Sequence, residues 1–311
     1  LQFVETNRLK PGETIQVDGR DESADSVLVI GLLVPPLAAQ QVQSSTKTKA
    51  PPAHGPPLPG DWPRMTKVNG PAGLGSLDTT SNSHTGGCSW FDYNGDFLPD
   101  LFITNGQGKG HYLFRNQGDG TFANVTNVIP KPNFQFEEAG VATADIDNDG
   151  DSDVLIAVDA PTASIQTFNS PIGGPNLLYV NQGDGTFVEA AASWGVIDPR
   201  GWRNITVNLA DIDNDGLIDA YFGCWAPNSG AYNKNNIMYR NVGGSFAQFN
   251  SNTAGNGRDT LAALFFDANF DLYPDLFIGN IAPFHAPPAF DCSDYWLHGG
   301  PGGVYTDVTA L

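Results

Sequence analysis

Hydrophobic and polar positions follow the same order four times along this chain. In each copy an apolar stretch rich in small or β-branched residues precedes an acidic loop, as in AGVATA, ITVNLA and LAALFF. A short hydrophobic run such as DVLIAV then follows the loop. Such a run, bounded by turn residues, is typical of a strand buried on both faces. Since no segment shows a sustained helical period with caps, the pattern predicts short strands joined by tight loops.

The acidic motif defines the period of the repeat. Its copies are DYNGDFLPDLFIT from Asp92, DIDNDGDSDVLIA from Asp145, DIDNDGLIDAYFG from Asp211 and DANFDLYPDLFIG from Asp267, spaced by 53, 66 and 56 residues. A second element follows each copy: YLFRNQGDGTFANVT, LLYVNQGDGTFVEAA, IMYRNVGGSFAQF and YWLHGGPGGVYTDVT. Gly-Asp-Gly between apolar runs indicates a hairpin. The unit of about 60 residues lies near the ~40–50-residue period of β-propeller blades.

The fold that follows is all-β, a β-propeller of four-stranded antiparallel blades, with four clear blades in this chain. In a meander, the acidic loop between strands one and two lies at the same end of the blade as the Gly-Asp-Gly turn between strands three and four. The longer and more variable connections then lie at the opposite end. Variable loops on a rigid scaffold are where binding sites usually lie, so we expect the ligand at that opposite end.

The acidic loops carry the chemistry of a hard-cation site. Ca²⁺ prefers about 6–8 oxygen ligands at roughly 2.3–2.6 Å. Each loop offers side-chain oxygens at positions 1, 3, 5 and 9, and a backbone carbonyl at position 7 would complete a cage with water. The predicted ligands are Asp92, Asn94, Asp96, Leu98 and Asp100; Asp145, Asp147, Asp149, Asp151 and Asp153; Asp211, Asp213, Asp215, Leu217 and Asp219; and Asp267, Asn269, Asp271, Tyr273 and Asp275. The sequence therefore predicts up to four Ca²⁺ ions.

The loops are not EF-hands, and they fall into two classes. An EF-hand needs a bidentate Glu at position 12, where this chain has the strand residues Ile103, Ile156, Phe222 and Ile278. Loops two and three have Gly150 and Gly216 at position 6, which permits positive φ. Loops one and four have Phe97 and Leu272 there, with proline at position 8. We therefore predict tighter Ca²⁺ binding at loops two and three.

The pairing of DIDNDGDSDVLIA with LYVNQGDGTF resembles the FG-GAP/VCBS repeats of integrin α-subunit propellers, of the cartilage acidic protein group and of many bacterial secreted proteins. The resemblance covers roughly residues 87 to 311. It implies a propeller with Ca²⁺ held at positions 1, 3, 5, 7 and 9 of the loops, used in adhesion, ligand binding or scaffolding outside the cell. Such propellers are often seven-bladed, whereas this chain shows four clear units.

Residues 1–86 lack the motif, and three hypotheses stand for their role. Strand-like segments within 1–49, including VLVIGLLV (27–34), form a divergent fifth blade, a small separate unit, or a strand added to a neighbouring subunit. Residues 50–64 are Pro-rich and predict a semi-rigid linker. The predicted organisation is thus an N-terminal segment (1–49), a linker (50–64) and a propeller (65–311).

Charge and cysteine content narrow the class of partner. The net charge is −19, with 34 acidic against 15 basic residues, which argues against nucleic acid or an anionic membrane as partner. The apolar run 27–34 is too short for a transmembrane segment. Three cysteines (Cys88, Cys224 and Cys292) allow at most one intramolecular disulfide, or three free thiols. The sequons at Asn124 and Asn204 give weak support for a secreted glycoprotein.

Three functional hypotheses remain. The first is a non-catalytic, extracellular or cell-surface Ca²⁺-binding propeller for adhesion, which binds a glycan or an extracellular protein, with Trp202, Trp225 and Trp296 as aromatic candidates. The second is a structural subunit that self-associates through its N-terminal strand. The third is a polysaccharide-acting enzyme, but no Gly-x-Ser-x-Gly elbow occurs, and the histidines, among them His285 and His298, show no metalloprotease spacing. We therefore expect no catalytic residues.

Overall fold

The computed structural model of this chain describes residues 72–74, 86–106, 110–131, 136–161, 173–198, 203–225, 236–249, 259–281 and 294–309. All of them lie within the compact unit Lys67–Leu311. Residues 1–71 lie outside the described residues, and so do Trp202, His285 and Cys292. The three hypotheses on the N-terminal segment, including a fifth blade, and the domain boundaries at 49 and 64 therefore stay predictions.

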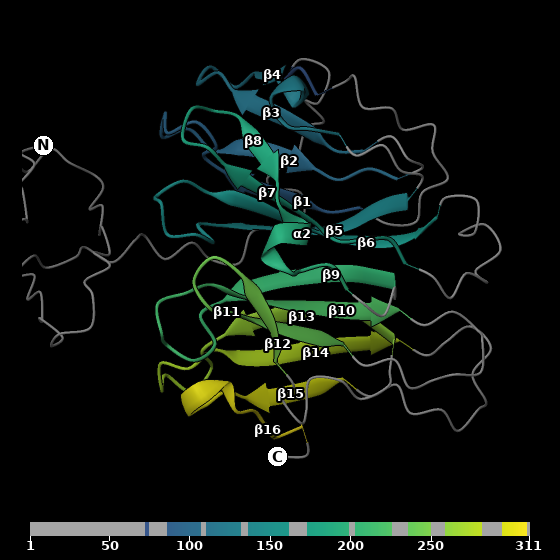
Figure 1. Ribbon diagram of the computed structural model, residues 1–311, viewed down its shortest axis with the longest axis vertical. Coiled ribbons are helices and arrows are strands. Elements are labelled where there is room, and N and C mark those ends of the chain that lie inside the picture. Colours follow the sequence, from purple (N-terminus) through teal and green to yellow (C-terminus); the bar gives the residue numbers. More distant parts are fainter. Residues whose placement is uncertain are drawn as a thin grey trace, which may run out of the picture. The chain divides into compact units, whose positions relative to one another are not determined.

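The described residues form four separate four-stranded antiparallel sheets, as predicted for four blades. Figure 1 shows them one after another, from β1 to β16. Blade one contains β1 (Cys88–Phe91), β2 (Asp100–Ile103), β3 (Tyr112–Asn116) and β4 (Phe122–Asn124). Blade two contains β5 (Phe136–Ala144), β6 (Asp153–Pro161), β7 (Leu177–Asn181) and β8 (Phe187–Glu189). Blade three contains β9 (Arg203–Ala210), β10 (Asp219–Trp225), β11 (Ile237–Asn241) and β12 (Phe246–Phe249). Blade four contains β13 (Asp259–Phe266), β14 (Asp275–Ile281), β15 (Tyr295–His298) and β16 (Thr306–Asp307).

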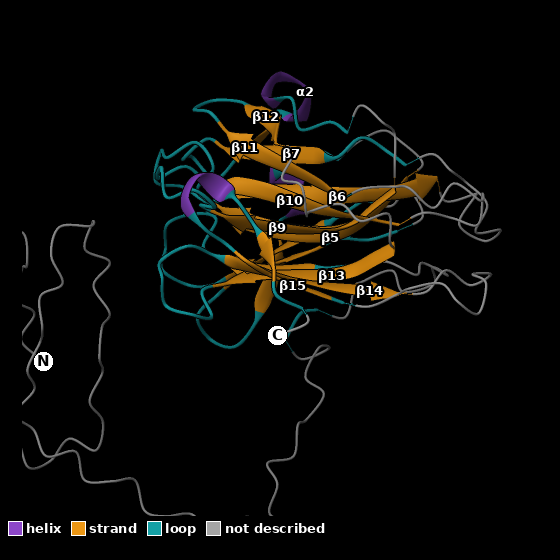
Figure 2. Cartoon of the chain, turned by 90° about the horizontal axis from the view of Figure 1, so that it is seen from below, coloured by secondary structure: helices purple, strands orange, loops and turns teal. Residues whose placement is uncertain are grey.

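Every sheet is a meander whose strands follow each other in chain order. The all-β prediction is confirmed, and the helical elements among the described residues are short: α2 (Ala191–Trp194), η2 (Thr126–Val128) and η3 (Pro301–Gly303). Figure 2 shows the strands running between two ends of the blades, with the described loops gathered at one end. The predicted common end for the acidic loops and the hairpin turns is therefore confirmed. Several strands reach further than the sequence indicated, β6 to Pro161 and β14 to Ile281.

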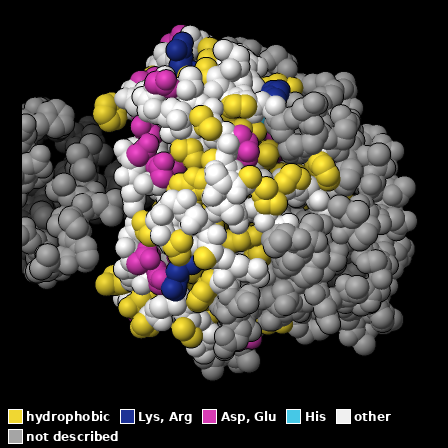
Figure 3. Space-filling view, in the orientation of Figure 1, with side chains coloured by type: hydrophobic (Ala, Val, Ile, Leu, Met, Phe, Trp, Pro, Cys, Tyr) yellow, Lys and Arg dark blue, Asp and Glu magenta, His cyan; other side chains and the backbone are white. Residues whose placement is uncertain are grey.

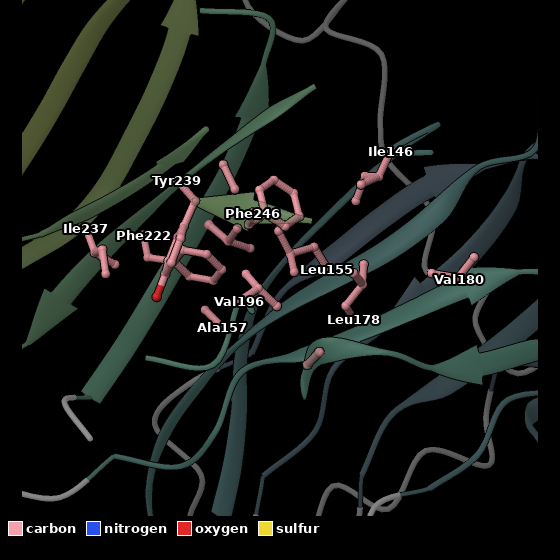
Figure 4. Close-up of a cluster of buried hydrophobic side chains, with 13 residues drawn as sticks. Ile146, Leu155, Ala157, Leu178, Val180, Val196, Phe222, Ile237, Tyr239 and Phe246 are labelled. Atoms are coloured by element: carbon pink, nitrogen blue, oxygen red, sulfur yellow. The ribbon is translucent and has the colours of Figure 1, made fainter. Parts of the chain in front are cut away.

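Consecutive blades pack face to face, and their first strands contact one another. A Cβ at Gly140 of β5 would lie 2.8 Å from the Cα of Thr206 in β9, so only glycine allows this approach. One hydrophobic cluster lies between each pair of neighbouring blades. Figure 4 shows the cluster between blades two and three, where Leu155 and Leu178 meet Phe222 and Tyr239. Strand β6 is buried on both faces from Asp153 to Ala160, as its apolar sequence predicts.

A polar contact also joins neighbouring blades at the end opposite the acidic loops. The residue just before the third strand of one blade lies within hydrogen-bonding distance of a first-strand residue of the next blade. The three pairs are His111–Glu138 at 3.1 Å, Asn176–Asn204 at 3.2 Å and Asn236–Thr260 at 2.9 Å. We call these contacts the inter-blade joints. They recur at equivalent repeat positions although the residue types differ.

The front face of blade four is the exception to this packing. A cross-strand pair between the second and third strands is buried by the next blade in blades one to three: Phe102–Leu113, Leu155–Leu178 and Tyr221–Met238. The equivalent pair in blade four is Phe277–Trp296, which is 38% and 41% exposed. Leu264 and Phe266 of β13 are exposed beside it. Among the described residues, no further blade covers this face.

Candidate metal centre

The four acidic loops share one hydrogen-bond pattern at position 1. One carboxylate oxygen of this Asp accepts the backbone N–H of position 5, and the other accepts the N–H of position 6. The pairs to position 5 are Asp92–Asp96, Asp145–Asp149, Asp211–Asp215 and Asp267–Asp271, at 3.0–3.2 Å. Those to position 6 end at Phe97, Gly150, Gly216 and Leu272, at 2.6–3.0 Å. The loop is therefore wound around its first carboxylate in every blade.

Positions 4 and 6 adopt left-handed backbone in all four loops. At position 4 the φ angles are 60–71°, at Gly95, Asn148, Asn214 and Phe270. At position 6 they are 64–101°, at Phe97, Gly150, Gly216 and Leu272. Gly150 and Gly216 take positive φ as predicted. Phe97 and Leu272 do so as well, although bulky side chains disfavour it, so proline at position 8 does not change the fold of the loop.

The loops two and three fit a Ca²⁺ ion by their oxygen spacing. Each of Asp145, Asp147 and Asp149 offers a carboxylate oxygen, and these three oxygens lie within 4.8 Å of one another. The same holds for Asp211, Asp213 and Asp215. Two oxygens bound to one Ca²⁺ at about 2.3–2.6 Å lie at most about 5 Å apart. The carboxylates of positions 1, 3 and 5 are thus close enough to share one ion.

In loops one and four the residue at position 3 is an asparagine that binds the neighbouring carboxylate. Asn94 donates to Asp96 at 3.0 Å, and Asn269 donates to Asp271 at 2.9 Å. Position 7 is held alike in all loops, because its N–H donates to the carboxylate of position 5 at 2.9 Å in Leu98, Asp151, Leu217 and Tyr273. The role of all these residues as metal ligands stays a prediction.

The aspartate at position 9 is fully buried and bonded through both oxygens. Asp153 accepts the N–H of Ile146 at 2.8 Å and that of Asn181 at 2.9 Å. The equivalents are Asp100, Asp219 and Asp275. Burial raises the pKa of Asp153 and Asp219 to about 7, although the two backbone donors lower it in part. A cation in the loop would favour the ionised carboxylate and oppose this shift.

Two kinds of hydrogen bond connect each loop to the next one. The side chain of Asn148 donates to the carbonyl of Gly216 at 3.1 Å, and that of Asn214 donates to the carbonyl of Leu272 at 2.8 Å. The buried Asn181 and Asn241, which end the third strands of blades two and three, donate to the position-2 carbonyls of Tyr93 and Ile146 in the preceding blades. The sequence prediction missed these roles, although the repeated Asn before Gly-Asp-Gly was a signal for the second.

Other predicted groups are placed away from this site. Cys88 and Cys224 are free, so a disulfide between them is excluded. Trp225 of β10 lies over the guanidinium of Arg203, which is paired with Asp159 at the end opposite the acidic loops. His298 packs edge-on against Trp296 on blade four. Among the described residues, no helix is long and apolar enough to cross a membrane.

Four blades with repeated aspartate loops define a repeat protein of the propeller type. Residues 92–156 and 167–222 match the FG-GAP-like repeat. A stretch of 52 residues is 54% identical to cartilage acidic protein 1 of Homo sapiens and 52% identical to that of Mus musculus, which is 17% of this chain and 8% of either relative. The Xenopus tropicalis protein is 42% identical over 64 residues, 10% of its length. The chain thus belongs to the FG-GAP repeat family, as its loops indicated.

Two solved structures are similar to the fold. An Agrocybe aegerita lectin that recognises non-reducing terminal N-acetylglucosamine aligns with 71% of this chain and 51% of its own, at a TM-score of 0.41 and 17% identity. The Vibrio cholerae biofilm matrix protein Bap1 aligns with 62% of this chain and 34% of its own, at a TM-score of 0.27 and 17% identity. At these TM-scores neither likeness bears on the function of this chain.

Proposed function

We propose that this chain is a non-catalytic, calcium-binding FG-GAP propeller segment of an extracellular or cell-surface protein. The observation that carries this proposal is the oxygen spacing in loops two and three, where three carboxylates lie within 4.8 Å. Carboxylates held this close repel one another unless a cation lies between them. The ion would be held by positions 1, 3 and 5, with position 7 contributing its carbonyl. Its charge stabilises the turn that connects the first two strands of each blade.

Calcium acts here on the blade scaffold, and the partner binds elsewhere. We propose that a glycan or an extracellular protein is bound at the end opposite the acidic loops, as in an adhesion module. Two facts support this: the acidic loops keep one geometry in all four blades, while the connections at the other end differ in length from blade to blade. Constant loops serve the scaffold, and variable loops on a rigid scaffold serve recognition.

A calcium titration tests the metal site. Isothermal titration of chelator-treated protein should show Ca²⁺ binding, and thermal unfolding should shift upward with Ca²⁺, since an ion that binds only the folded state stabilises it. The double variant Asp145→Asn with Asp211→Asn should lose the tightest sites. Asp184→Asn is the matched control, because Asp184 lies in an exposed hairpin turn and bonds only Thr186 among described contacts. A melting temperature unchanged by Ca²⁺ would contradict the proposal.

A second candidate function is assembly of copies, which the front face of blade four favours. Leu264, Phe266, Phe277 and Trp296 form an exposed apolar face at the positions that bury against the next blade elsewhere in the chain. A strand surface of this kind readily packs on a second copy. Sedimentation of the intact protein should show self-association, and Phe277→Glu should abolish it, whereas Val188→Glu on the outer strand of blade two should not. A monomer at all concentrations counts against assembly.

A further inference from the structure

Loops one and four place large apolar side chains at their tips, in contrast to loops two and three. Phe97 is 94% exposed, Phe270 is 87% exposed and Leu272 is 75% exposed. All three have positive φ, of 64°, 61° and 75°. Loops two and three have the same backbone at these positions but use asparagine or glycine. The fold of the loop therefore does not require the apolar residues.

These side chains are unfavourable in the free protein for two reasons. Left-handed backbone is strained for a bulky residue, and an almost fully exposed ring gains nothing from burial. Among the described residues, no ring packs against Phe97 or Phe270. Strained residues of this kind persist where they serve a function. Their natural replacements are present in the same chain, so we infer that the apolar tips contact a partner.

The geometry of the tips favours a lipid surface over a protein. Figure 3 shows acidic side chains gathered along the edge of the loops, with apolar side chains protruding from the same edge. The tips belong to blades one and four and lie separately, whereas a protein partner is usually bound by a contiguous patch with a packed centre. A bilayer accepts separate apolar anchors, because each ring inserts among the acyl chains on its own.

Charge decides when this contact forms. The net charge of −19 repels anionic headgroups, as the sequence prediction states. A Ca²⁺ ion in the loop reverses the local sign, and its 6–8 coordination positions exceed what one loop supplies. Phosphate or carboxylate oxygens of a lipid headgroup can take the remaining positions. The cation therefore brings the loop edge to an anionic surface, where the tips insert.

We propose that the loop edge of this propeller binds anionic phospholipid bilayers in the presence of Ca²⁺, with Phe97, Phe270 and Leu272 as the inserting side chains. This rests on the proposed function, because it requires the ion in loops one and four. The three residues then explain why these loops depart from the Asn and Gly of loops two and three. The exclusion of anionic membranes by charge holds for the calcium-free protein.

Vesicle co-sedimentation tests the proposal on the intact protein. Vesicles of phosphatidylserine and phosphatidylcholine are mixed with protein in Ca²⁺ or in chelator. The triple variant Phe97→Gly, Phe270→Asn and Leu272→Gly copies the residues of loops two and three, so it keeps the loop backbone. We expect wild-type binding in Ca²⁺ only, and a loss of roughly ten-fold or more in the triple variant. The control Val188→Thr with Leu261→Thr removes exposed apolar groups away from the tips and should bind as wild type.

Two further measurements separate the failure of this inference from that of the proposed function. Calcium titration without lipid should show that wild type and triple variant both bind Ca²⁺. Calcium binding without vesicle binding, or equal vesicle binding by the triple variant, overturns the membrane proposal alone. No calcium binding overturns both. In Phe97→Trp, the tip fluorescence should shift to the blue and be quenched by brominated lipid in Ca²⁺; an unchanged spectrum contradicts insertion.

Discussion

Arg240 of β11 forms an ion pair with Asp213, the third residue of loop three, at an Nη2–Oδ2 distance of 2.8 Å. The same guanidinium donates to the carbonyl of Gly302 and lies over the ring of Phe249, so it is fixed in place. Blade two has Val180 at the equivalent position, and loop two has no such pair. An arginine bonded to a predicted ligand competes with a cation for that carboxylate. The structure thus separates loops two and three, which their sequences place in one class.

The first prediction concerns this competition. Arg240→Met should raise the Ca²⁺ affinity of loop three by roughly two- to five-fold, the range of a partly exposed ion pair. Calorimetric titration in an Asp145→Asn background resolves the site. Arg115→Met is the control, since Arg115 is the exposed equivalent in blade one and should leave the affinity of loop three unchanged. A lower affinity in Arg240→Met would show that the arginine holds Asp213 in the binding geometry instead.

The second prediction concerns the bond between blades at Asn181. Its Nδ2 donates to the carbonyl of Tyr93 in blade one at 2.9 Å, in a buried environment. Asn181→Ala should lower the free energy of unfolding by about 1–3 kcal/mol, because it leaves a buried carbonyl unbonded. Asn116→Ala is the control: Asn116 has the same bond to its hairpin, but its Nδ2 reaches Pro99 within its own blade. Denaturant unfolding should show a clearly smaller loss for the control, and equal losses would contradict the inter-blade role.

The third prediction concerns the inter-blade joint between His111 and Glu138, both fully buried. Their outer atoms, Nε2 and Oε2, have no hydrogen-bond partner, whereas the next joint uses two asparagines. His111→Asn or Glu138→Asn alone should cost about 2–3 kcal/mol by leaving its partner unpaired. The double variant, which recreates the Asn176–Asn204 pair, should cost less than the sum of the two. A double-mutant cycle from denaturant unfolding measures this, and additive losses would exclude direct coupling.

The fourth prediction separates the two sequons. Asn124 is exposed, and its Oδ1 accepts from the hydroxyl of Thr126 at 2.7 Å. Asn204 is fully buried and bonded to Asn176, so a folded molecule has no room for a glycan there. When the protein is secreted by a eukaryotic host, mass spectrometry should find glycan at Asn124 and none at Asn204. Asn124→Gln should remove all N-glycan, and remaining glycan on the folded variant would contradict the assignment.

Much of the fold was predictable from the residues. The alternation of apolar runs with DIDNDG and NQGDGTF predicted the four-stranded meanders, their number and the common end of the loops. Position 6 in loops two and three predicted positive φ, because glycine favours it. Phe97 and Leu272 could not have been assigned that backbone from their own preference. They adopt it because the carboxylate of position 1 binds the N–H groups of positions 5 and 6 in every loop.

The contacts between blades were not predictable in the same way. Asn148 and Gly216 are 68 residues apart, and Arg240 reaches Asp213 from a strand that follows the loop. A repeat shows which residues are equivalent, yet it does not show which equivalents face one another. The same holds for the front face of blade four, whose Phe277 and Trp296 have the sequence of a buried pair.

By itself, the sequence determined the blade, the turn chemistry and the set of carboxylates in each loop, since all of these depend on residues close together in the chain. Only the tertiary structure decided which carboxylate is paired with Arg240, which loops are joined by asparagine, and which apolar residues stay exposed. These outcomes depend on the angle and distance between packed sheets. Hydrophobic packing sets both, through contacts between residues that lie one repeat apart.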